Sequence, residues 1–600
     1  MYLSPSAVRR LASSLPPRLS PYLLCRRTMA TTLPRLPVLE AVATHDPAST
    51  AVVHSLSGRS FTYGELLGDV GRAMDRIRHA RGGADLDGER VAFLVENSYD
   101  YVVTLLAIMA ARSIAVPLSP AFPVPELQYI LNQSEASVLV SSAKFGAKAK
   151  QVLESDLTAS PSHLELSKHL GGQGKKEDIS WDDAGPGNAG MMLYTSGTTN
   201  RPKGVLLPQS VLAAQSKSLI EAWEYSPKDR LLHVLPLHHI HGTVNAILTP
   251  LLAGSSIEFM FPFNADAVWS RLAAPFLPTN GTSSPAQAKP KITFFTVVPT
   301  VYSRLLATHK LLPPEMQTAA RTAVSPEHMR LSISGSAALP TPIKASWRSL
   351  SHGSVLLERY GMTEVGMALS CGLHPSDRVD ASVGWPLPSV QARLVDVDTG
   401  DVIQPGEGDV DPVTGRERSG EIQLRGPTIF KEYWRNPTAT AAEFVSDPDG
   451  KGSWFKTGDV AVRRPVESAA FAQSWTKGPL YFILGRKSAD IIKTGGEKVS
   501  ALEVERELLS LPEVSEAAVV AVPSGNWGQK VGAVLILNSE VATTWSPMDM
   551  RRALKGRLAN YKIPQVMKLV DHIPRNAMGK INKKQLVKSI FKDEHSDDEM

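Results

Sequence analysis

Short apolar runs alternate with longer amphipathic stretches from about residue 40 to residue 485. Four of the runs have the length and the β-branched or aromatic content of buried strands: 90–96 (RVAFLVE), 137–142 (SVLVSS), 291–299 (KITFFTVVP) and 330–335 (RLSISG). Strands that alternate with helical stretches are typical of an α/β fold. The pattern therefore predicts a large N-terminal domain with α/β layers over residues 40–485.

The pattern changes after residue 486, where the elements become shorter. Ser500 and Glu503 have the spacing of a capping box and predict a helix that reaches Leu509 and stops before Pro512. Two strand candidates follow, 516–523 (EAAVVAVP) and 531–538 (VGAVLILN). We expect a small, mobile α+β domain over 486–590 and a disordered acidic tail over 591–600.

Three polar stretches interrupt the large domain and are expected to be exposed loops: 171–190, 277–290 and 398–420. With 43% hydrophobic and 20% charged residues, the chain has an ordinary globular composition. It contains no run of about 18 apolar residues, so we expect no transmembrane segment. Its two cysteines, Cys25 and Cys371, are too few for a disulfide framework and indicate a reducing compartment.

The formal charge of +5 comes from the first 39 residues, which hold six arginines and no acid. The rest is nearly neutral, which argues against a nucleic-acid partner because phosphate binding needs a dense basic face. Val8, Leu11 and Leu15 fall on one side of a short helix, as in a mitochondrial import sequence. We expect residues 1–39 to be a transit peptide to the matrix, with a disordered basic tail as the alternative. Met29 offers a start for a cytosolic form.

The most informative segment is 193–204 (LYTSGTTNRPKG). Its hydroxyls, glycine and lysine suit a turn that holds a phosphate chain. It is not a Walker A loop, because Pro202 stands where the second glycine should be and Gly204 where Ser or Thr would hold magnesium. The candidate phosphate-binding residues are Thr195, Ser196, Gly197, Thr198, Thr199, Asn200, Arg201, Pro202 and Lys203.

Five further motifs follow in order: RYGMTE (359–364), GEIQLRGP (420–427), WFKTGD (454–459), LGRKSADIIKTGGEKVSALEVE (484–505) and PRNAMGK (574–580). With the phosphate loop, they resemble the acyl-CoA synthetase and luciferase superfamily, which makes acyl-adenylates. The resemblance covers most of the chain. It departs at Asn200 and Glu432, where the family usually has glycine; asparagine tolerates positive φ, so the turn at Asn200 should survive.

The resemblance implies ATP, Mg²⁺ and coenzyme A as substrates and cofactor. Residues 195–203 would cradle the triphosphate, Thr363 would contact phosphate, and Glu364 would hold magnesium. Asp459 would accept the ribose hydroxyls, and Arg486 would face the nucleotide at the start of the interdomain hinge. The mobile Lys580 would balance charge as the carboxylate meets the α-phosphate. The residues expected at the thiol cofactor, once the C-terminal domain turns, are Gly495, Gly496 and Lys498.

The acid is expected to be a dicarboxylate. Arg359 stands beside the nucleotide site, where many relatives carry an uncharged residue, and a buried guanidinium is costly unless it is paired. His239 and Ser334 add polar groups to the acid site, together with His241 and Ser336. For His238 a place in the core or in a turn is an equal alternative. For Arg359 the alternative is an ion pair with Glu358 or another carboxylate of the protein.

The phrases LPLHHIHG (235–242), SGSAALP (334–340) and LLERYGMTEVGMALS (356–370) resemble the mitochondrial malonyl-CoA synthetases. The resemblance implies malonate first and methylmalonate second. The main alternative is a CoA ligase for an aryl or medium-chain monocarboxylic acid, which needs an apolar pocket. Two others are a domain that loads a carrier protein and a catalytically silent nucleotide binder.

Overall fold

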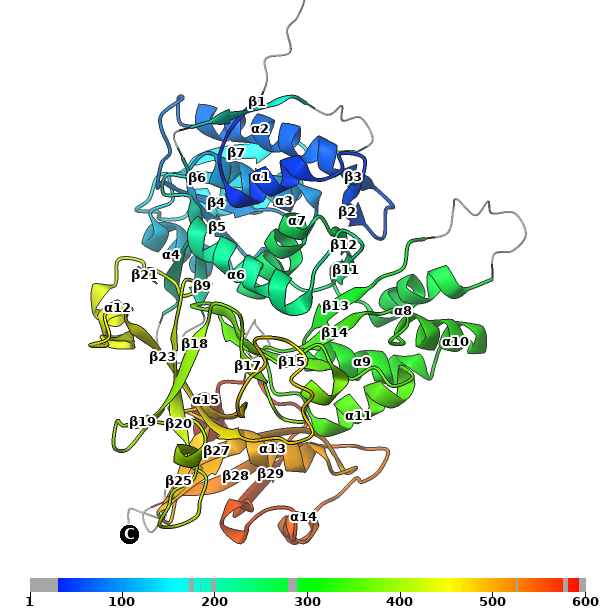
Figure 1. The fold of residues 1–600 in the computed structure, drawn as a ribbon, viewed down its shortest axis with the longest axis vertical. Helices are drawn as coiled ribbons and strands as arrows, with labels where there is room; N and C mark the ends of the chain where they lie inside the picture. Colours follow the sequence, from blue (N-terminus) through cyan, green and yellow to red (C-terminus); the bar gives the residue numbers. More distant parts are fainter. Residues whose placement is uncertain are drawn as a thin grey trace, which may run out of the picture.

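A large α/β domain and a small C-terminal domain make up the chain (Figure 1). The computed structural model describes residues 31–171, 177–183, 185–195, 201–278, 289–524, 527–575 and 581–592. All four strands expected in the large domain form. They are β4 (Arg90–Leu94), β6 (Val138–Ser142), β13 (Phe294–Val297) and β14 (Leu331–Ser334). Their observed lengths are shorter than the apolar runs that predicted them.

Two mixed sheets form the body of the large domain. The first contains, in spatial order, β21 (Glu432–Tyr433), β10 (Lys203–Pro208), β9 (Gly190–Thr195), β5 (Ile114–Pro117), β4, β6 and β7 (Ser162–Leu166). The second contains β17 (Trp385–Pro386), β16 (Gly366–Ser370), β15 (Leu357–Met362), β14, β13, β11 (Arg230–His233), β12 (Ser256–Phe259), β2 (Thr50–His54) and β3 (Ser60–Thr62). The central strands of both are parallel, as apolar runs joined by helices predict.

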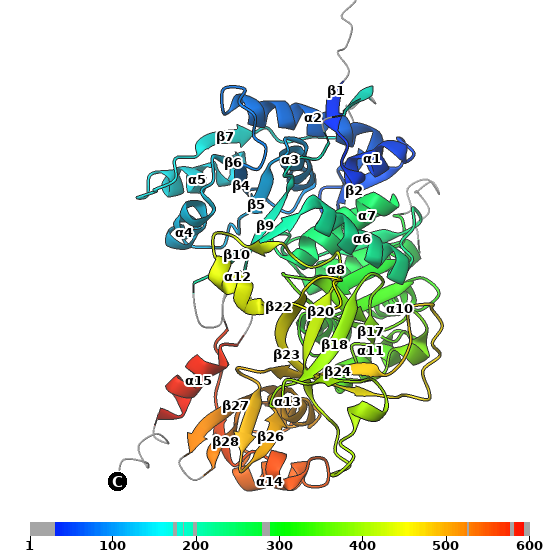
Figure 2. The same ribbon diagram turned by 60° about the vertical axis from the view of Figure 1, so that its left-hand side comes forward.

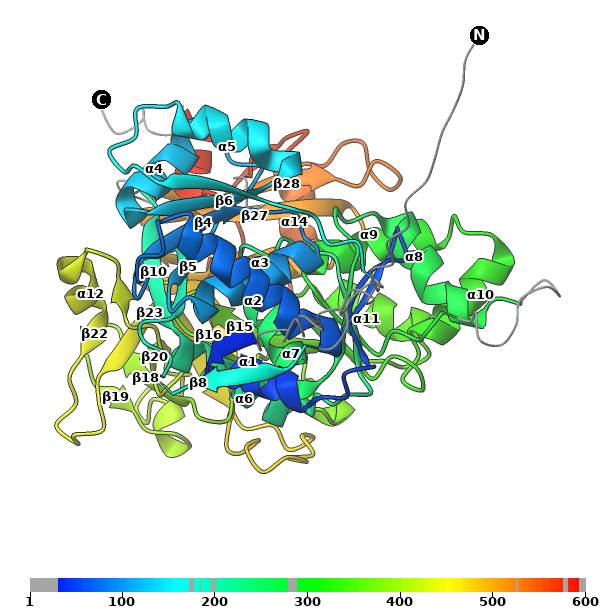
Figure 3. The same ribbon diagram turned by 90° about the horizontal axis from the view of Figure 1, so that it is seen from above.

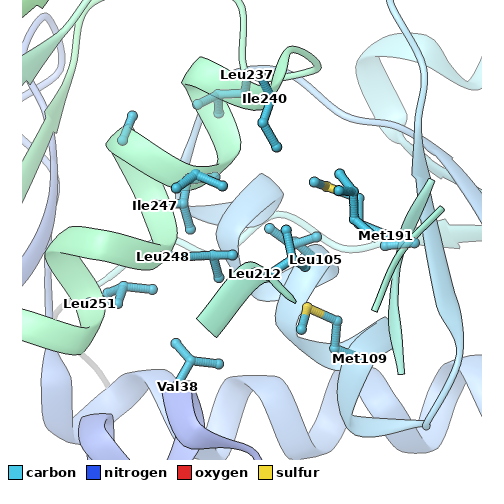
Figure 4. Close-up of a cluster of buried hydrophobic side chains, with 14 of the residues drawn as sticks. Val38, Leu105, Met109, Met191, Leu212, Leu237, Ile240, Ile247, Leu248 and Leu251 are labelled. Carbon is cyan, nitrogen blue, oxygen red and sulfur yellow. The ribbon is translucent and has the colours of Figure 1, made fainter. Parts of the chain in front are cut away.

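The core lies where α3 (Tyr99–Ala110) contacts both sheets, at β5 and β2. All twelve α3 residues are buried, and a helix that is mostly apolar on every side is typical of such a position. It runs beside α2 (Tyr63–His79), as the view from above shows (Figure 3). Leu105 and Met109 of α3 lie with Leu212 of α6 (Gln209–Trp223) and Leu248 in one buried cluster (Figure 4).

A third, antiparallel sheet lies between this body and the C-terminal domain (Figure 2). Its strands are β19 (Val402–Ile403), β18 (Gln391–Asp396), β20 (Gly420–Arg425), β23 (Trp454–Arg464) and β22 (Phe444–Val445), with β24 (Leu480–Arg486) paired to β23. The C-terminal sheet contains β26 (Glu497–Ser500), β25 (Ile491–Thr494), β28 (Gly528–Leu537) and β27 (Val514–Ser524), with β29 (Val566–Leu569) paired to β28. Both strands expected in this domain therefore form.

The other helices cover these sheets. In the large domain they are α1 (Pro37–Thr44), α4 (Val124–Ser134), α5 (Gly146–Leu153), α7 (Thr249–Ala253), α8 (Ala265–Ala273), α9 (Pro299–His309), α10 (Pro314–Ala323), α11 (Thr341–Leu350) and α12 (Pro437–Glu443). The C-terminal helices are α13 (Ala501–Leu509), α14 (Pro547–Leu554) and α15 (Lys583–Ile590). Across the described parts of the chain, every helix is too short or too polar to cross a membrane.

The helix expected after Ser500 is α13, and the Ser500 hydroxyl accepts from the Glu503 amide at 3.1 Å. The reciprocal half of the expected capping box is absent, because the Glu503 carboxylate instead pairs with Lys562 at 2.7 Å. The box is thus reduced to a one-sided serine cap. The tertiary ion pair has replaced the local bond.

Three predicted boundaries differ from the structure. Residues 31–39, assigned to the leader, include β1 (Thr31–Pro34), which pairs with β8 (Ile179–Asp182), and Leu33 is fully buried. Two of the expected exposed loops also contain strands, β8 within 171–190 and β19 within 398–420, and Ile403 of β19 is fully buried. Phe591, placed in the acidic tail, packs in the C-terminal core, and residues 593–600 lie outside the described part.

Candidate active site

The expected phosphate loop connects β9 to β10. Thr195, the last residue of β9, pairs with Lys203, the first residue of β10. The Tyr129 hydroxyl of α4 donates to the Pro202 carbonyl at 2.8 Å, and the Arg201 guanidinium lies 5.5 Å from the Tyr129 ring centroid. The base of the loop is thus held by a strand pair and a helix. The loop residues outside the described part of the chain are Ser196, Gly197, Thr198, Thr199 and Asn200.

Lys203 and Glu364 come together through Tyr433. The Lys203 ammonium lies 4.1 Å from the Tyr433 ring centroid, a cation–π distance, and the Tyr433 hydroxyl donates to Glu364 Oε1 at 2.9 Å. Burial raises the pKa of Glu364, although Tyr433 and Lys203 oppose the shift. Thr363 precedes Glu364 in the turn after β15. Sequence reasoning missed Tyr433, which β21 places beside β10.

Asp459 and Arg486 lie directly opposite each other on β23 and β24. Arg486 Nε is 3.0 Å from Asp459 Oδ1, and the Tyr360 hydroxyl donates to Oδ2 at 2.5 Å. Arg486 also donates to the Thr457 carbonyl at 2.6 Å. The two expected nucleotide residues are therefore one preorganised unit. Tyr360 connects this unit to β15. Sequence reasoning also missed Tyr360, although it lies inside the motif RYGMTE.

Arg359 is the neighbour of Tyr360 on β15 and is only 4% exposed. Successive side chains of a strand point to opposite faces, so Glu358 points away from Arg359 and pairs with Lys344 at 3.0 Å. The expected alternative, an Arg359–Glu358 pair, is therefore wrong. Among the described residues no carboxylate lies within ion-pair distance of the Arg359 guanidinium, and its Nε has no hydrogen-bond partner. Burial lowers the pKa of Arg359 to about 10, so it is charged at neutral pH.

The contacts of the Arg359 fork are neutral. Its Nη2 donates to His241 Nδ1 at 2.5 Å, and both Nη atoms lie 3.4 Å from the Ser336 hydroxyl. His241 Nε2 is 3.3 Å from the Thr296 carbonyl, which assigns the proton of the neutral ring to Nε2. Burial and the nearby Arg359 charge lower the pKa of His241 well below its usual value. Gly335 provides the space that the Arg359 side chain occupies, since a Cβ at Gly335 would lie 2.6 Å from Arg359 Cζ.

The other expected acid-site residues surround this pair. His239 is close enough to His241 to contribute to its lowered pKa, and its ring lies 4.3 Å from that of His238. The Ser334 hydroxyl is buried on β14 without a hydrogen-bond partner within the described chain. His241 contacts Arg359. It begins a π-helical segment, His241–Leu248, whose residues are all buried.

The expected CoA residues form a tight turn between β25 and β26. Gly495 and Gly496 have φ of +55° and +84°, as a two-residue hairpin turn requires, and Thr494 pairs with Glu497 across it. Lys498 forms an ion pair with Asp398, and Glu497 pairs with Arg416 at 3.2 Å. The hairpin is therefore attached to the 398–418 segment of the large domain. Lys580 lies outside the described residues.

A loop between two paired strands beside a buried carboxylate, together with a small C-terminal domain, is the arrangement expected of an AMP-binding enzyme. The chain belongs to this family. The family model for AMP-binding enzymes matches residues 39–434, and that for the AMP-binding enzyme C-terminal domain matches residues 503–580. The superfamily resemblance and the expected fold class are thereby confirmed.

Known relatives cover nearly the whole chain. A "CoA ligase" of Gibberella moniliformis is 57% identical over 581 residues, 94% of this chain and 96% of the relative. The human "Malonate--CoA ligase ACSF3, mitochondrial" is 38% identical over 548 residues, 88% of each chain. The ATP-bound crystal structure of MatB from Rhodopseudomonas palustris is 30% identical with a TM-score of 0.73, over 92% of this chain and 99% of MatB. This protein is thus an AMP-forming acid–CoA ligase, with ATP and CoA as substrates.

Proposed function

We propose that this ligase activates malonate, with methylmalonate as a second substrate. The observation that carries the proposal is the buried Arg359 guanidinium, which contacts only neutral groups in the described structure. A buried cation costs several kcal/mol unless an anion pairs with it. A diacid supplies that anion while its other carboxylate reacts. The malonate ligase named among the relatives supports the same choice.

The reaction has two steps. A carboxylate oxygen of the acid attacks the α-phosphorus of ATP, the bond to the leaving pyrophosphate breaks, and an acyl-adenylate forms. The CoA sulfur then attacks the acyl carbonyl, and AMP leaves. Because both steps depend on position and charge balance, the chain's task is to orient the reactants and to neutralise developing charge.

Individual residues have separate tasks in this scheme. Lys203 and the loop that begins at Thr195 hold the triphosphate, with Thr363 beside it. Asp459, acceptor-only as a carboxylate, is oriented by Tyr360 and Arg486 to receive the ribose hydroxyls. Lys580 would balance the negative charge where carboxylate meets α-phosphate, a role that suits a flexible point charge.

Magnesium fits the donor set at this site as a partner of the nucleotide. Within the described residues no group of three or more His, Cys, Asp or Glu side chains could hold a metal alone. Mg²⁺ commonly binds through one or two carboxylates together with substrate phosphates and water. Glu364, close enough to Lys203 and Arg486 for both charges to oppose the rise of its pKa, is the carboxylate that would hold it. When bound, the ion supplies charge neutralisation at the phosphates.

Arg359 would bind the second carboxylate of the diacid, the one that does not react with ATP. Its planar fork matches a carboxylate in two parallel hydrogen bonds. His241 fixes the fork because its Nδ1 lone pair accepts from Nη2, while its own proton is held by the Thr296 carbonyl. A monocarboxylic acid with an apolar tail would leave the charge unpaired.

We also propose a mitochondrial location. The Arg-rich, acid-free N-terminus supports it, as does the mitochondrial relative. Since Thr31 to Pro34 form a strand of the folded domain, the proposed leader ends before Thr31. Fusion of residues 1–30 to a fluorescent protein tests the location, and a diffuse cytosolic signal would contradict it.

A pyrophosphate-release screen tests the substrate. The full-length ligase is given ATP and equal concentrations of malonate, methylmalonate, succinate, acetate, hexanoate or benzoate, with and without CoA. We expect malonate to give the largest kcat/KM, with thioester formed only when CoA is present. Faster turnover of hexanoate or benzoate than of malonate would replace the proposal by the monocarboxylic alternative.

A further inference from the structure

A cavity of about 630 Å³ lies between α12 and the third sheet of the large domain. Helix α12, strand β22 and the ends of β18 and β20 contribute to its lining (Figure 2). None of the residues proposed to bind ATP, the acid or CoA lines it. Because small-molecule sites typically enclose about 300–1,000 Å³, the cavity has room for a small organic ligand.

Two lysines without ion-pair partners line this cavity. Lys431 directly precedes β21, and Lys451 lies in the loop before β23. Within the described chain neither ammonium has a carboxylate at ion-pair distance, and no aspartate or glutamate lines the cavity. The third cation of the lining, Arg425, is already neutralised, because its Nη1 lies 2.8 Å from both carboxylate oxygens of Asp449. The two ammonium charges are therefore uncompensated.

Apolar side chains form much of the remaining lining. The ring of buried Phe430 has its centroid 5.5 Å from that of half-buried Phe444, and Ile429 and Pro427 also line the cavity. A phosphate monoester carries close to two negative charges at neutral pH, and its oxygens accept from ammonium groups. A carboxylate, with one charge, would leave one lysine unpaired. The lining therefore matches a small phosphorylated molecule with an apolar body.

The wall of the cavity is connected to the candidate magnesium carboxylate. The Phe430 amide donates to the Glu364 carbonyl at 2.8 Å, and the Lys431 amide donates to the Leu206 carbonyl of β10 at 3.0 Å. The Phe430 ring lies 4.9 Å from the ring of Tyr433, whose hydroxyl donates to the Glu364 carboxylate. Two aromatic side chains thus connect the cavity to that carboxylate. A dianion in the cavity and a triphosphate beside Glu364 would repel each other through a medium of low dielectric.

We propose that this cavity is an effector site for a small phosphorylated organic molecule, which binds through Lys431 and Lys451 and weakens the binding of ATP. Coupling between two binding sites is reciprocal, so ATP weakens the binding of the effector by the same factor. The acid substrate plays no part in this coupling, so the inference is independent of the proposed choice of malonate.

Calorimetric titration of the full-length ligase with phenyl phosphate tests the site. We expect phenyl phosphate to bind more tightly than benzoate or inorganic phosphate. Lys431→Gln and Lys451→Gln should each raise the Kd for phenyl phosphate about 10- to 100-fold, as loss of a hydrogen bond between charged groups does. Phe444→Ala should weaken the binding of phenyl phosphate but not of inorganic phosphate. Lys310→Gln makes the same change at an exposed lysine after α9 and should change neither Kd.

The link to ATP is measured with Mg²⁺ and the unreactive analogue α,β-methylene-ATP. Saturating analogue should raise the Kd for phenyl phosphate about 5-fold, and saturating phenyl phosphate should raise the Kd for the analogue by the same factor. The double variant Lys431→Gln/Lys451→Gln should abolish this effect. Complete displacement by the analogue would mean that phenyl phosphate occupies the nucleotide site and would overturn the proposal. Equally tight binding of benzoate, unchanged binding in the double variant, or absence of coupling would overturn it as well. Absent malonate turnover in the unmodified ligase would instead refute the substrate proposal alone.

Discussion

Replacing Arg359 by glutamine removes the charge on which the proposed acid site depends. Loss of one partner from a buried, hydrogen-bonded charge pair costs about 3–5 kcal/mol, which lowers kcat/KM for malonate about 100- to 5,000-fold. Acetate brings no second carboxylate, so its low turnover should stay the same or rise. KM for ATP should also stay unchanged, because the Tyr360–Asp459 unit remains intact.

The same substitution predicts an unusual effect on stability. In the free protein Arg359 is a buried cation whose hydrogen-bond partners among the described residues are the neutral side chains of His241 and Ser336. Its replacement by a neutral amide removes a desolvated charge, so the free energy of unfolding should be unchanged or higher by about 1–2 kcal/mol. Thermal denaturation without ligands measures this, and saturating malonate should raise Tm only in the unmodified protein.

The assay is continuous pyrophosphate release with malonate and acetate in parallel. Arg359→Lys keeps the charge but loses the fork and should fall between the parent and Arg359→Gln. Arg304→Gln makes the same chemical change at an exposed position of α9 and serves as the matched control. A malonate-to-acetate ratio unchanged in Arg359→Gln would refute the reasoning.

Three further predictions concern other parts of the site. Lys580→Ala should slow pyrophosphate release about 100-fold or more, while thioester formation from a supplied acyl-adenylate persists; equal losses would remove the proposed role. Because burial raises the pKa of Glu364, activity should fall with acidification at a higher pH than for an ordinary glutamate. Tyr433→Phe deletes a hydrogen bond to the ionised Glu364 carboxylate, so the pKa of Glu364 should rise further. The acid limb of the pH–rate profile should then move to a pH about half to one unit higher. Asp398→Asn with Arg416→Gln should speed thioester formation up to about 5-fold and reduce its salt dependence, as loss of exposed ion pairs allows; an unchanged salt profile would count against it.

The strand candidates named from the sequence all form, because the alternation that marks them depends on near neighbours. It could not predict pairing between distant segments. β1 was assigned to the leader since its surroundings are basic and acid-free, yet its partner β8 lies almost 150 residues later. The lost half of the Glu503 capping box has the same origin, in a lysine from another part of the domain.

The candidate site shows a similar division. Motifs predicted Lys203, Glu364, Asp459 and Arg359, and the structure brings the first two together through a tyrosine. The sequence placed His239 and His241 together at the acid site, and the structure shows a contact between His241 and Arg359. That contact depends on how the backbone winds after residue 240, which the order of residues alone does not reveal.

That winding has a consequence for how the acid preference of such a ligase could change. The π-helical segment His241–Leu248 is wound with i→i+5 hydrogen bonds, each one residue longer than the i→i+4 bonds of an ordinary α-helix. Deleting a single residue inside it would restore regular winding and turn the preceding side chains by about 100° relative to those that follow. The imidazole would swing away from the guanidinium with no pocket residue replaced. We therefore expect the number of residues in this segment to influence which acids the ligase accepts, a change that libraries of point mutations do not sample.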